Sequence, residues 1–189
     1  RGRRGRHAAS RERYPAPARA LCAGMPAAGA GAPERAVAIQ GAPGCNSDVA
    51  VTECAADGLA LPCFSFEDAL DAVREGRAAR AMIPIENSLH GRVADMHFLL
   101  PESGLVITGE HFLPIRHCLI GTGPADGVRE AMSHPQALGQ ARHWLRERGI
   151  RAIPFADTAA AVAERAEMGA PPHLAALAPA RAAGIYRRP

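Results

Sequence analysis

The sequence predicts an α/β fold with largely parallel strand pairing, and three observations support this. Short apolar runs alternate with stretches whose apolar residues recur at helical spacing, which is typical of βαβ units. Capping residues and glycines mark the ends of those stretches. Hydrophobic residues make up 48% of the 189 residues and aromatic residues only 4%. We therefore expect one domain, or two small lobes, with a core of Ala, Val, Leu and Ile.

Residues 1–35 differ in composition from the rest of the chain. They are rich in Arg, Ala, Pro and Gly, show neither a helical nor an alternating period, and are predicted to be a disordered leader. They carry a net charge of +6, whereas residues 36–189 carry −3. We therefore expect no nucleic-acid partner for the folded part. An RNA-binding tail is the alternative for residues 1–6, but this stretch is short and lacks interleaved aromatic residues.

The first predicted elements lie between residues 36 and 85. Residues 36–40 are predicted to form a strand, followed by a turn over residues 41–44 and a helix from Ser47. Ser65 is predicted to cap a second helix, because Asp68 follows three residues later and apolar residues then share one helical face. Gly76 stands where a glycine ends such a helix, and residues 79–85 are the next predicted strand.

The second half is predicted to start with an extended segment that crosses between two lobes. Residues 105–121 are too long for one ordinary strand, and Pro114 interrupts them. Ser133, with Gln136 three residues later, is predicted to cap a helix. The remaining predictions are an end to that helix at Gly149, a strand over 151–155, a helix from Asp157 to Gly169, a strand over 174–177 and a helix start at 179–186.

Two polar runs follow predicted elements and could carry chemistry. Glu86, Asn87 and Ser88 come at the predicted carboxyl end of a strand, where open α/β sheets bind ligands. Ser133 and His134 start a predicted helix, whose free amides and dipole suit a carboxylate ligand. His134 could also titrate near neutral pH. Plain helix capping explains both runs equally well, and without further information it is the favoured interpretation.

The cysteines and histidines do not form a recognisable metal site. Cys45, Cys54 and Cys63 are nine residues apart, which does not match paired metal-ligand spacing. The five cysteines are consistent with reduced thiols in a cytoplasmic protein. No apolar run is long enough to span a membrane. We therefore expect no metal, no membrane partner and a cytoplasmic location.

Four runs of the sequence, in their order, resemble the catalytic domain of prephenate dehydratase. They are Ile83 to Ser88, Gly91 to Asp95, Gly109 to Leu119 and Ser133 to Gln140. The similarity covers about residues 36–186. It implies a two-lobed fold like that of the type II periplasmic binding proteins, with the substrate between the lobes. The first lobe would take residues 36–109 and the second residues 110–189.

The resemblance implies a lyase of L-phenylalanine biosynthesis that removes carbon dioxide and water from prephenate to give phenylpyruvate. The reaction needs no cofactor or metal, and it depends on positioning and general-acid assistance. The implied partners are prephenate and, in a homodimer, a second copy. The implied catalytic residues are Glu86, Asn87, Ser88 and His134, and the implied substrate-binding residues are Gly41, Gly44, Ser47, Ser133, Gln136, Ala137 and Thr158.

The sequence departs from the family pattern at two places. Asn46, instead of an aromatic residue, precedes Ser47. The family carries Thr-Arg-Phe on a strand that returns to the first lobe, and its Thr is held to be central to catalysis; this run is absent from the 189 residues, as is the ACT regulatory domain. We therefore expect a truncated domain, with an incomplete second lobe and return strand, and little dehydratase activity. The alternative is a non-catalytic two-lobed module that binds small carboxylates.

Overall fold

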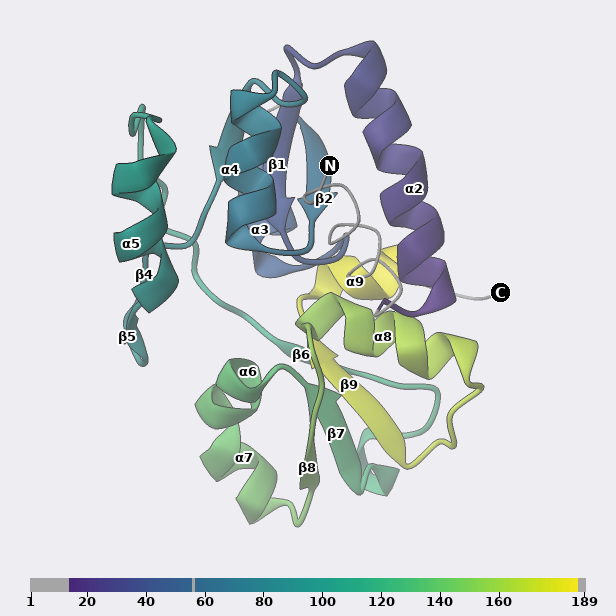
Figure 1. Cartoon of the computed structure of the whole chain (residues 1–189). Coiled ribbons are helices and arrows are strands. Elements are labelled where there is room, and N and C mark those ends of the chain that lie inside the picture. Colours follow the sequence, from purple (N-terminus) through teal and green to yellow (C-terminus); the bar gives the residue numbers. More distant parts are fainter. Residues whose placement is uncertain (1–13, 56, 187–189) are drawn as a thin grey trace.

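The chain forms two α/β lobes, which lie one above the other in Figure 1 and are joined by an extended crossing segment over residues 104–117. The computed structural model describes residues 14–55 and 57–186, with only the backbone of residues 24–30. The predicted α/β class is confirmed. Parallel strand pairs outnumber antiparallel pairs, as the alternation of strands and helices predicts.

The first lobe is built on a three-stranded parallel sheet in the order β2-β1-β3. Ser65 caps a helix on this sheet as predicted, because its Oγ accepts the Asp68 N–H at 3.1 Å. Gly76 follows the end of that helix in the left-handed region, with φ of +71°. The elements are β1 (Ala36–Gln40), α3 (Asn46–Cys54), β2 (Leu59–Cys63), α4 (Phe66–Arg74) and β3 (Arg80–Met82).

A small hairpin and a helix separate the first sheet from the crossing segment. The strand predicted over residues 79–85 is too long, since β3 ends at Met82. The chain then forms β4 (Glu86–Asn87), β5 (Gly91–Arg92) and α5 (Ala94–Ser103), none of which the sequence pattern predicts. Residues 105–117 form no helix or strand, so the predicted strand over 105–121 shrinks to its last part.

The second lobe is built on a four-stranded sheet in the order β6-β9-β7-β8. β6 runs antiparallel to β9, and the other pairs are parallel. Asp157 caps a helix as predicted, accepting the Ala160 N–H at 2.8 Å. The elements are β6 (Cys118–Ile120), η1 (Ala125–Gly127), β7 (Glu130–Ser133), α6 (Pro135–Gln140), α7 (Arg142–Glu147), β8 (Arg151–Pro154), α8 (Thr158–Glu167), β9 (Leu174–Ala178) and α9 (Ala180–Ile185).

A helix, α2 (Ala16–Gly31), occupies most of residues 14–35, the described part of the segment that the sequence predicts to be disordered. The prediction is wrong for these residues, whereas residues 1–13 lie outside the described part. Alanine has the highest helix propensity, so an Ala-rich segment can form a helix without a periodic apolar pattern. α2 packs against β2 of the first lobe and α8 of the second. Figure 1 shows α2 running along the first lobe, with its N-terminal end beside α8 of the second lobe.

The largest hydrophobic cluster is shared by both lobes and by α2. Ile39 of β1 and Val51 of α3 belong to it, together with Val162 of α8 and Leu174 of β9. Ala18 of α2 is fully buried in the same cluster. The lobes and α2 therefore stabilise one another through common apolar contacts.

The substitution Ala18→Asp should destabilise the protein, because it places a carboxylate in a fully buried apolar contact. We expect a loss of at least about 2 kcal/mol in the free energy of unfolding, measured by urea titration. Ala20→Asp on the exposed side of the same helix is the matched control, with a change within about 0.5 kcal/mol. Equal effects of the two variants would show that α2 is not packed on the lobes.

Candidate active site

The glycine turn after β1 lies directly against the second lobe. Gly41 has φ of +120°, and a Cβ on it would lie 2.9 Å from Oδ2 of Asp157. Gly44 has φ of +89°, and its Cβ would lie 2.7 Å from Cα of Ala182. Both positions therefore need glycine for backbone conformation and for space. Both are buried, so the predicted substrate-binding glycines form a contact between lobes in this structure.

The start of α3 holds a buried carboxylate and an uncapped helix end. Cys45 precedes α3 and offers no side-chain capping bond. Asp48 is 1% exposed, and its Oδ2 accepts the Gly44 N–H at 2.7 Å and Nε–H of Arg181 at 2.8 Å. A carboxylate in the first turn of a helix is further stabilised by the helix dipole. Asp48 therefore ties α9 to the first lobe through Arg181.

A pocket of about 600 Å³ opens beside α3. Its size falls within the range that small-molecule sites occupy. Arg116 of the crossing segment lines it and has no ion-pair partner among the described residues, whereas Glu53 in the same wall pairs with His111 at 2.8 Å. The lining comes from α3 (Asn46, Val49, Thr52, Glu53), the crossing segment (Leu113, Pro114, Arg116) and the region of α9 (Pro179, Ala180, Arg181, Gly184, Ile185).

Asn46 joins this pocket to a partly buried histidine. Its Nδ2 lies 3.3 Å from Nε2 of His117, at the end of the crossing segment. Burial lowers the pKa of His117, so its imidazole is neutral at neutral pH. Ser47, a predicted substrate contact, is the next residue of the same helix start. The start of α3 thus offers amide, hydroxyl and imidazole groups beside an arginine.

A group of desolvated ionisable side chains lies where α2, the glycine turn and α9 meet. Burial raises the pKa of Asp157 to about 6, although the amide groups of Ala160, Ala42 and Ala159 counteract the rise. Burial also raises the pKa of Tyr14, of Cys45 and of Tyr186. The Tyr186 hydroxyl has no hydrogen-bond partner within the described part of the chain. Next to Asp157, the predicted contact Thr158 is 7% exposed and starts α8.

The polar run at residues 86–88 lies on the β4–β5 hairpin and not at the end of a sheet strand. Asn87 Oδ1 accepts the Leu89 N–H at 2.9 Å and the His90 N–H at 3.2 Å, so it closes a hairpin turn and caps no helix. Glu86 and Ser88 are exposed. Both the strand-end and the helix-cap interpretation of this run are therefore wrong. Each strand of the hairpin has only two residues, too few to show an alternating pattern in the sequence.

The predicted helix start near Ser133 is shifted by one residue. Ser133 is the last residue of β7, is fully buried, and donates its hydroxyl to the Leu177 carbonyl at 2.5 Å. It therefore does not cap the helix. His134 is the cap, since its Nδ1 accepts the Gln136 N–H at 3.2 Å. Burial lowers the pKa of His134. Gln136 is exposed, and Ala137 is buried in the core of the second lobe.

The structure gathers the predicted site residues in two places. The glycine turn, Ser47 and Thr158 lie around the starts of α3 and α8. The hairpin lies over α6, because a Cβ on Gly139 would be 3.2 Å from Nε2 of His90. Sequence reasoning missed Asp48, Arg116 and Arg181 as site groups. The pairing of Asp48 with Arg181, 133 residues apart, leaves no local signal.

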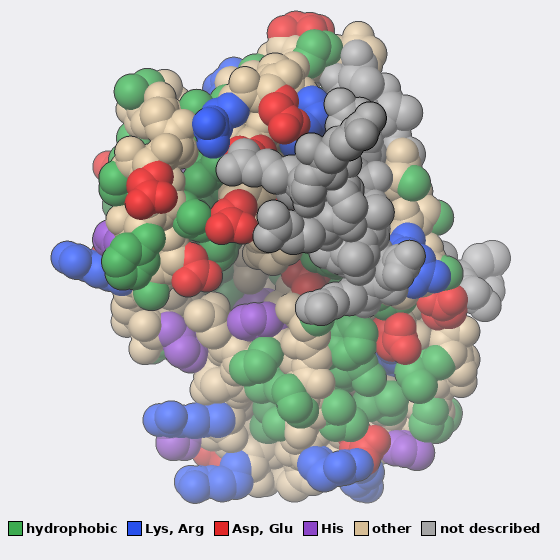
Figure 2. Space-filling model, in the orientation of Figure 1, with side chains coloured by type: hydrophobic (Ala, Val, Ile, Leu, Met, Phe, Trp, Pro, Cys, Tyr) green, Lys and Arg blue, Asp and Glu red, His purple; other side chains and the backbone are tan. Residues whose placement is uncertain are grey.

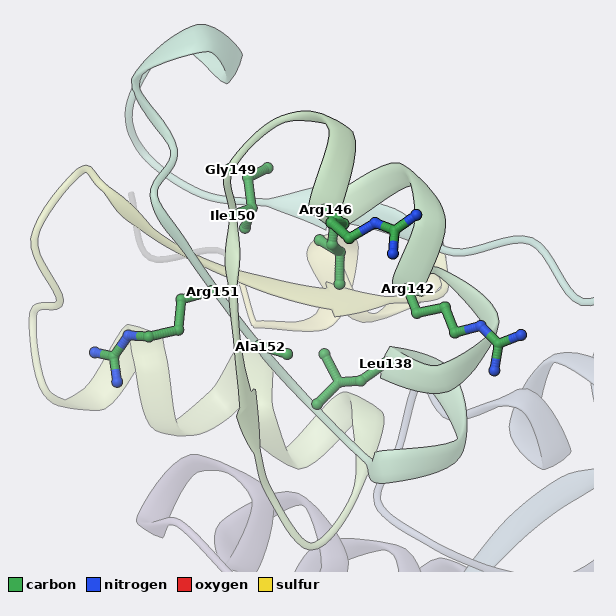
Figure 3. A pocket seen from close by; sticks show the side chains of 8 residues that line it. Leu138, Arg142, Arg146, Gly149, Ile150, Arg151 and Ala152 are labelled. Carbon is green, nitrogen blue, oxygen red and sulfur yellow. The ribbon is translucent and has the colours of Figure 1, made fainter.

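A second pocket, of about 350 Å³, lies between the α6–α7 region and β8. It has an apolar floor that includes Leu138 and Ile150, and three arginines line it. Figure 3 shows Arg151 extending to the side opposite to Arg142 and Arg146, so the three guanidinium groups do not converge. Arg151 pairs with Glu130. None of the residues predicted for the site lines either pocket, but Asn46, the neighbour of the predicted contact Ser47, lines the pocket beside α3, which is therefore the better candidate.

Residues 14–55 and 57–186 contain no group of three His, Cys, Asp or Glu side chains placed to hold a metal ion. They also contain no helix that combines the length and the apolar character needed to cross a membrane.

Comparison with known proteins gives a family match over most of the chain. The model of the prephenate dehydratase family matches residues 37–188. A bifunctional N-acyl-homoserine lactone acylase/prephenate dehydratase of Komagataeibacter europaeus is 43% identical over 139 residues, which are 72% of this chain and 49% of that protein. Arogenate dehydratase 3 of Arabidopsis thaliana is 40% identical over 156 residues, 79% of this chain and 36% of that protein. The chain thus spans half or less of the length of these relatives.

Two solved structures resemble the chain. A quorum-quenching acylase, GqqA, has a TM-score of 0.73 and 41% identity, covering 80% of this chain and 56% of that one. The prephenate dehydratase from Staphylococcus aureus subsp. aureus Mu50 has a TM-score of 0.64 and 19% identity, covering 79% and 56%. The second likeness concerns the fold, which agrees with the predicted two-lobed architecture.

The substitution Gly44→Ala should separate α9 from the first lobe. The new Cβ would collide with the Ala182 backbone and would also require a left-handed conformation. We expect a loss of more than about 2 kcal/mol in unfolding free energy, measured by chemical denaturation. Gly184→Ala, within α9 and without neighbours at 4 Å, is the control and should be neutral or stabilising. A Gly44→Ala variant as stable as the wild type would contradict the close contact.

The partly buried, desolvated carboxyl of Asp157 should make stability fall between about pH 4 and pH 6. Its folded-state pKa of about 6 lies above the ordinary 3.8, so the folded protein holds the proton more tightly than the unfolded chain. The stabilisation is complete below the unfolded pKa and is lost as the pH rises through 6, by up to about 3 kcal/mol. Asp157→Asn should flatten this pH dependence in urea titrations at pH 4 and 7.5. Asp126→Asn at an exposed position is the control. An unchanged pH profile in Asp157→Asn would assign the dependence to other groups.

Proposed function

The chain belongs to the prephenate dehydratase family, and we propose that its two lobes bind prephenate while residues 1–189, taken by themselves, convert it to phenylpyruvate slowly or not at all. The family match across residues 37–188 carries this proposal. It points to lyase chemistry in aromatic amino acid biosynthesis. The relatives are named as prephenate or arogenate dehydratases, so the two substrates belong in the same test.

The pocket beside α3 supplies chemistry that suits a small dicarboxylate. Arg116 is a cation without a described ion-pair partner, and Asn46 at the start of α3 lines the same pocket. Arginine and a helix start are both favourable partners of a carboxylate. Arg181 should attract a ligand carboxylate less strongly than Arg116, because its charge is already paired with Asp48. We therefore assign carboxylate binding to Arg116, with Asn46 and Ser47 as hydrogen-bonding groups.

The reaction needs a proton for the departing hydroxide, and positioning supplies the rest. Aromatisation of the ring drives the loss of carbon dioxide and water, so the protein has to hold the substrate and deliver a proton. His134 is neutral at neutral pH because burial lowers its pKa, which suits hydrogen bonding more than proton donation. Within the proposal, His134 and Asn87 orient the substrate from the second lobe and the hairpin.

Weak turnover follows from the same assignment. The 189 residues contain no Thr-Arg-Phe run, the segment to which the family resemblance gives the central catalytic Thr. The hairpin residues Glu86 and Ser88 face solvent, and no hydrogen bond within the described residues connects them with the start of α3. The groups that would act together on one substrate are therefore incompletely assembled.

A second candidate function is the hydrolysis of N-acyl-homoserine lactones. It is favoured by the names of two similar proteins, at 43% identity over 72% of this chain and at 41% identity over 80% of it. A non-catalytic module for small carboxylates is the third candidate. These candidates differ in what they bind and in what they convert, so one set of measurements separates them.

The test combines calorimetric titration with activity assays on the purified chain. We expect prephenate to bind and phenylpyruvate formation to be far below that of a full-length family member. Arg116→Ala should weaken prephenate binding at least tenfold, about 1.4 kcal/mol. Arg80→Ala, an exposed arginine on β3 outside the pocket, should leave binding unchanged.

Turnover comparable to that of a full-length enzyme would overturn the proposed low activity. Absence of prephenate and arogenate binding would overturn the proposed substrate. Equal affinity for prephenate and for an unrelated dicarboxylate such as succinate would favour the general binding module. Release of a fatty acid from an N-acyl-homoserine lactone, without prephenate binding, would favour the acylase.

A further inference from the structure

The pocket of about 350 Å³ between the α6–α7 region and β8, the α7 pocket, is separate from the proposed substrate site. It shares no lining residue with the pocket beside α3, and Figure 1 places α7 at the end of the second lobe that is remote from the first lobe. Its floor is apolar, since Leu138, Leu145 and Ile150 line it and are at most 7% exposed. Its volume lies at the lower end of the range that small-molecule sites occupy.

The turn that leads from α7 into β8 holds this floor in place. Gly149 follows α7 with φ of +63°, the left-handed conformation of a glycine that ends a helix. Its N–H donates to the Arg146 carbonyl at 3.1 Å, and the Ile150 N–H donates to the Leu145 carbonyl at 2.9 Å. Leu145 and Ile150 also belong to the hydrophobic cluster of the second lobe. The floor is therefore preformed, which lowers the entropy cost of binding a ligand.

Two arginines of α7 add positive charge that no neighbouring carboxylate neutralises. Arg142 and Arg146 are four residues apart, so they share one face of the helix, and Figure 3 shows both extending to the same side. Neither has an ion-pair partner among the described residues, whereas Arg151 across the pocket pairs with Glu130. None of the residues that line the pocket is acidic. The α7 pocket therefore combines an apolar floor with uncompensated positive charge.

We propose that the α7 pocket binds a small monocarboxylate with an apolar body, such as a single aromatic ring. The ring covers the apolar floor, and the carboxylate lies at the guanidinium groups of Arg142 and Arg146. Arginine suits this ligand, because its planar head matches a carboxylate and its aliphatic stem packs on apolar groups. An amino acid is disfavoured, since its ammonium group would lie beside two cations. A phosphate or acetate ion leaves the floor unused, and a neutral aromatic compound leaves the charges unpaired.

Calorimetric titration of the full chain with phenylacetate tests the proposal. We expect a dissociation constant of about 1 mM or lower, as befits a compact ligand in a small pocket. Acetate lacks the ring, phenylacetamide lacks the charge, and phenylalanine adds an ammonium group. Each of these three probes should bind at least about tenfold more weakly than phenylacetate.

Variants of the pocket locate the binding. Arg142→Ala and Arg146→Ala should each weaken phenylacetate binding at least about threefold, and the double variant at least about tenfold. Arg148→Ala is the matched control, because Arg148 belongs to the same region but stacks on Trp144 at 4.1 Å and does not line the pocket. Ala152→Phe should abolish binding, because Ala152 lines the pocket from an exposed position on the edge strand β8. Far-ultraviolet circular dichroism of each variant separates loss of binding from loss of fold.

Four outcomes would overturn the proposal. The first is no phenylacetate binding up to about 10 mM. The second is binding that Arg116→Ala abolishes while the double variant and Ala152→Phe retain it, which would place the ligand beside α3. The third is equal affinity for acetate or for phenylacetamide, which would mean that the floor or the arginines contribute nothing. The fourth is an equal loss in Arg148→Ala, which would reveal a general effect of charge and not a site.

Discussion

The close approach of the glycine turn to the second lobe is the contact on which the rest of the structure depends. Residues 41–44 come near the starts of α8 and α9 only because two of them lack a side chain. That approach lets Asp48 reach Arg181 and lets one apolar cluster extend through both lobes. It also desolvates the partly buried Asp157, whose pKa rises as a result. One steric condition therefore sets the packing, the ion pair and the protonation of the region.

The parts of the fold that sequence reasoning predicts are those fixed by neighbouring residues. Ser65 and Asp157 cap their helices as predicted, because each side chain accepts the N–H of the residue three positions later, and such a bond depends only on neighbouring residues. Ser133 shows the limit of that reasoning. The capping pattern is present in the sequence, but Ser133 ends a strand and donates its hydroxyl to the Leu177 carbonyl. His134 caps the helix instead. α2 was missed for the opposite reason, since alanine propensity and packing on distant elements leave no periodic pattern.

The candidate site follows the same division. The resemblance to the family indicates which short runs of sequence would contribute residues to the site, and the structure places these runs in two groups. The hairpin group reaches α6, while the turn group lies between the lobes. The cations of the pocket, Arg116 and Arg181, come from segments whose position depends on tertiary packing, so no spacing in the sequence reveals them. Figure 2 shows why charge alone is a poor guide, because basic and acidic side chains are dispersed over the visible face.

The helix α2 has a consequence for how fast a ligand could enter or leave. It lies outside the residues that match the family, yet it packs against both lobes and its Ala18 is fully buried. Any opening of the lobes must strain or release these contacts. Binding that waits for such an opening has a lowered association rate, whatever the final affinity. For the proposed binding beside α3, any opening that breaks the contacts of α2 therefore slows the entry and the exit of the ligand.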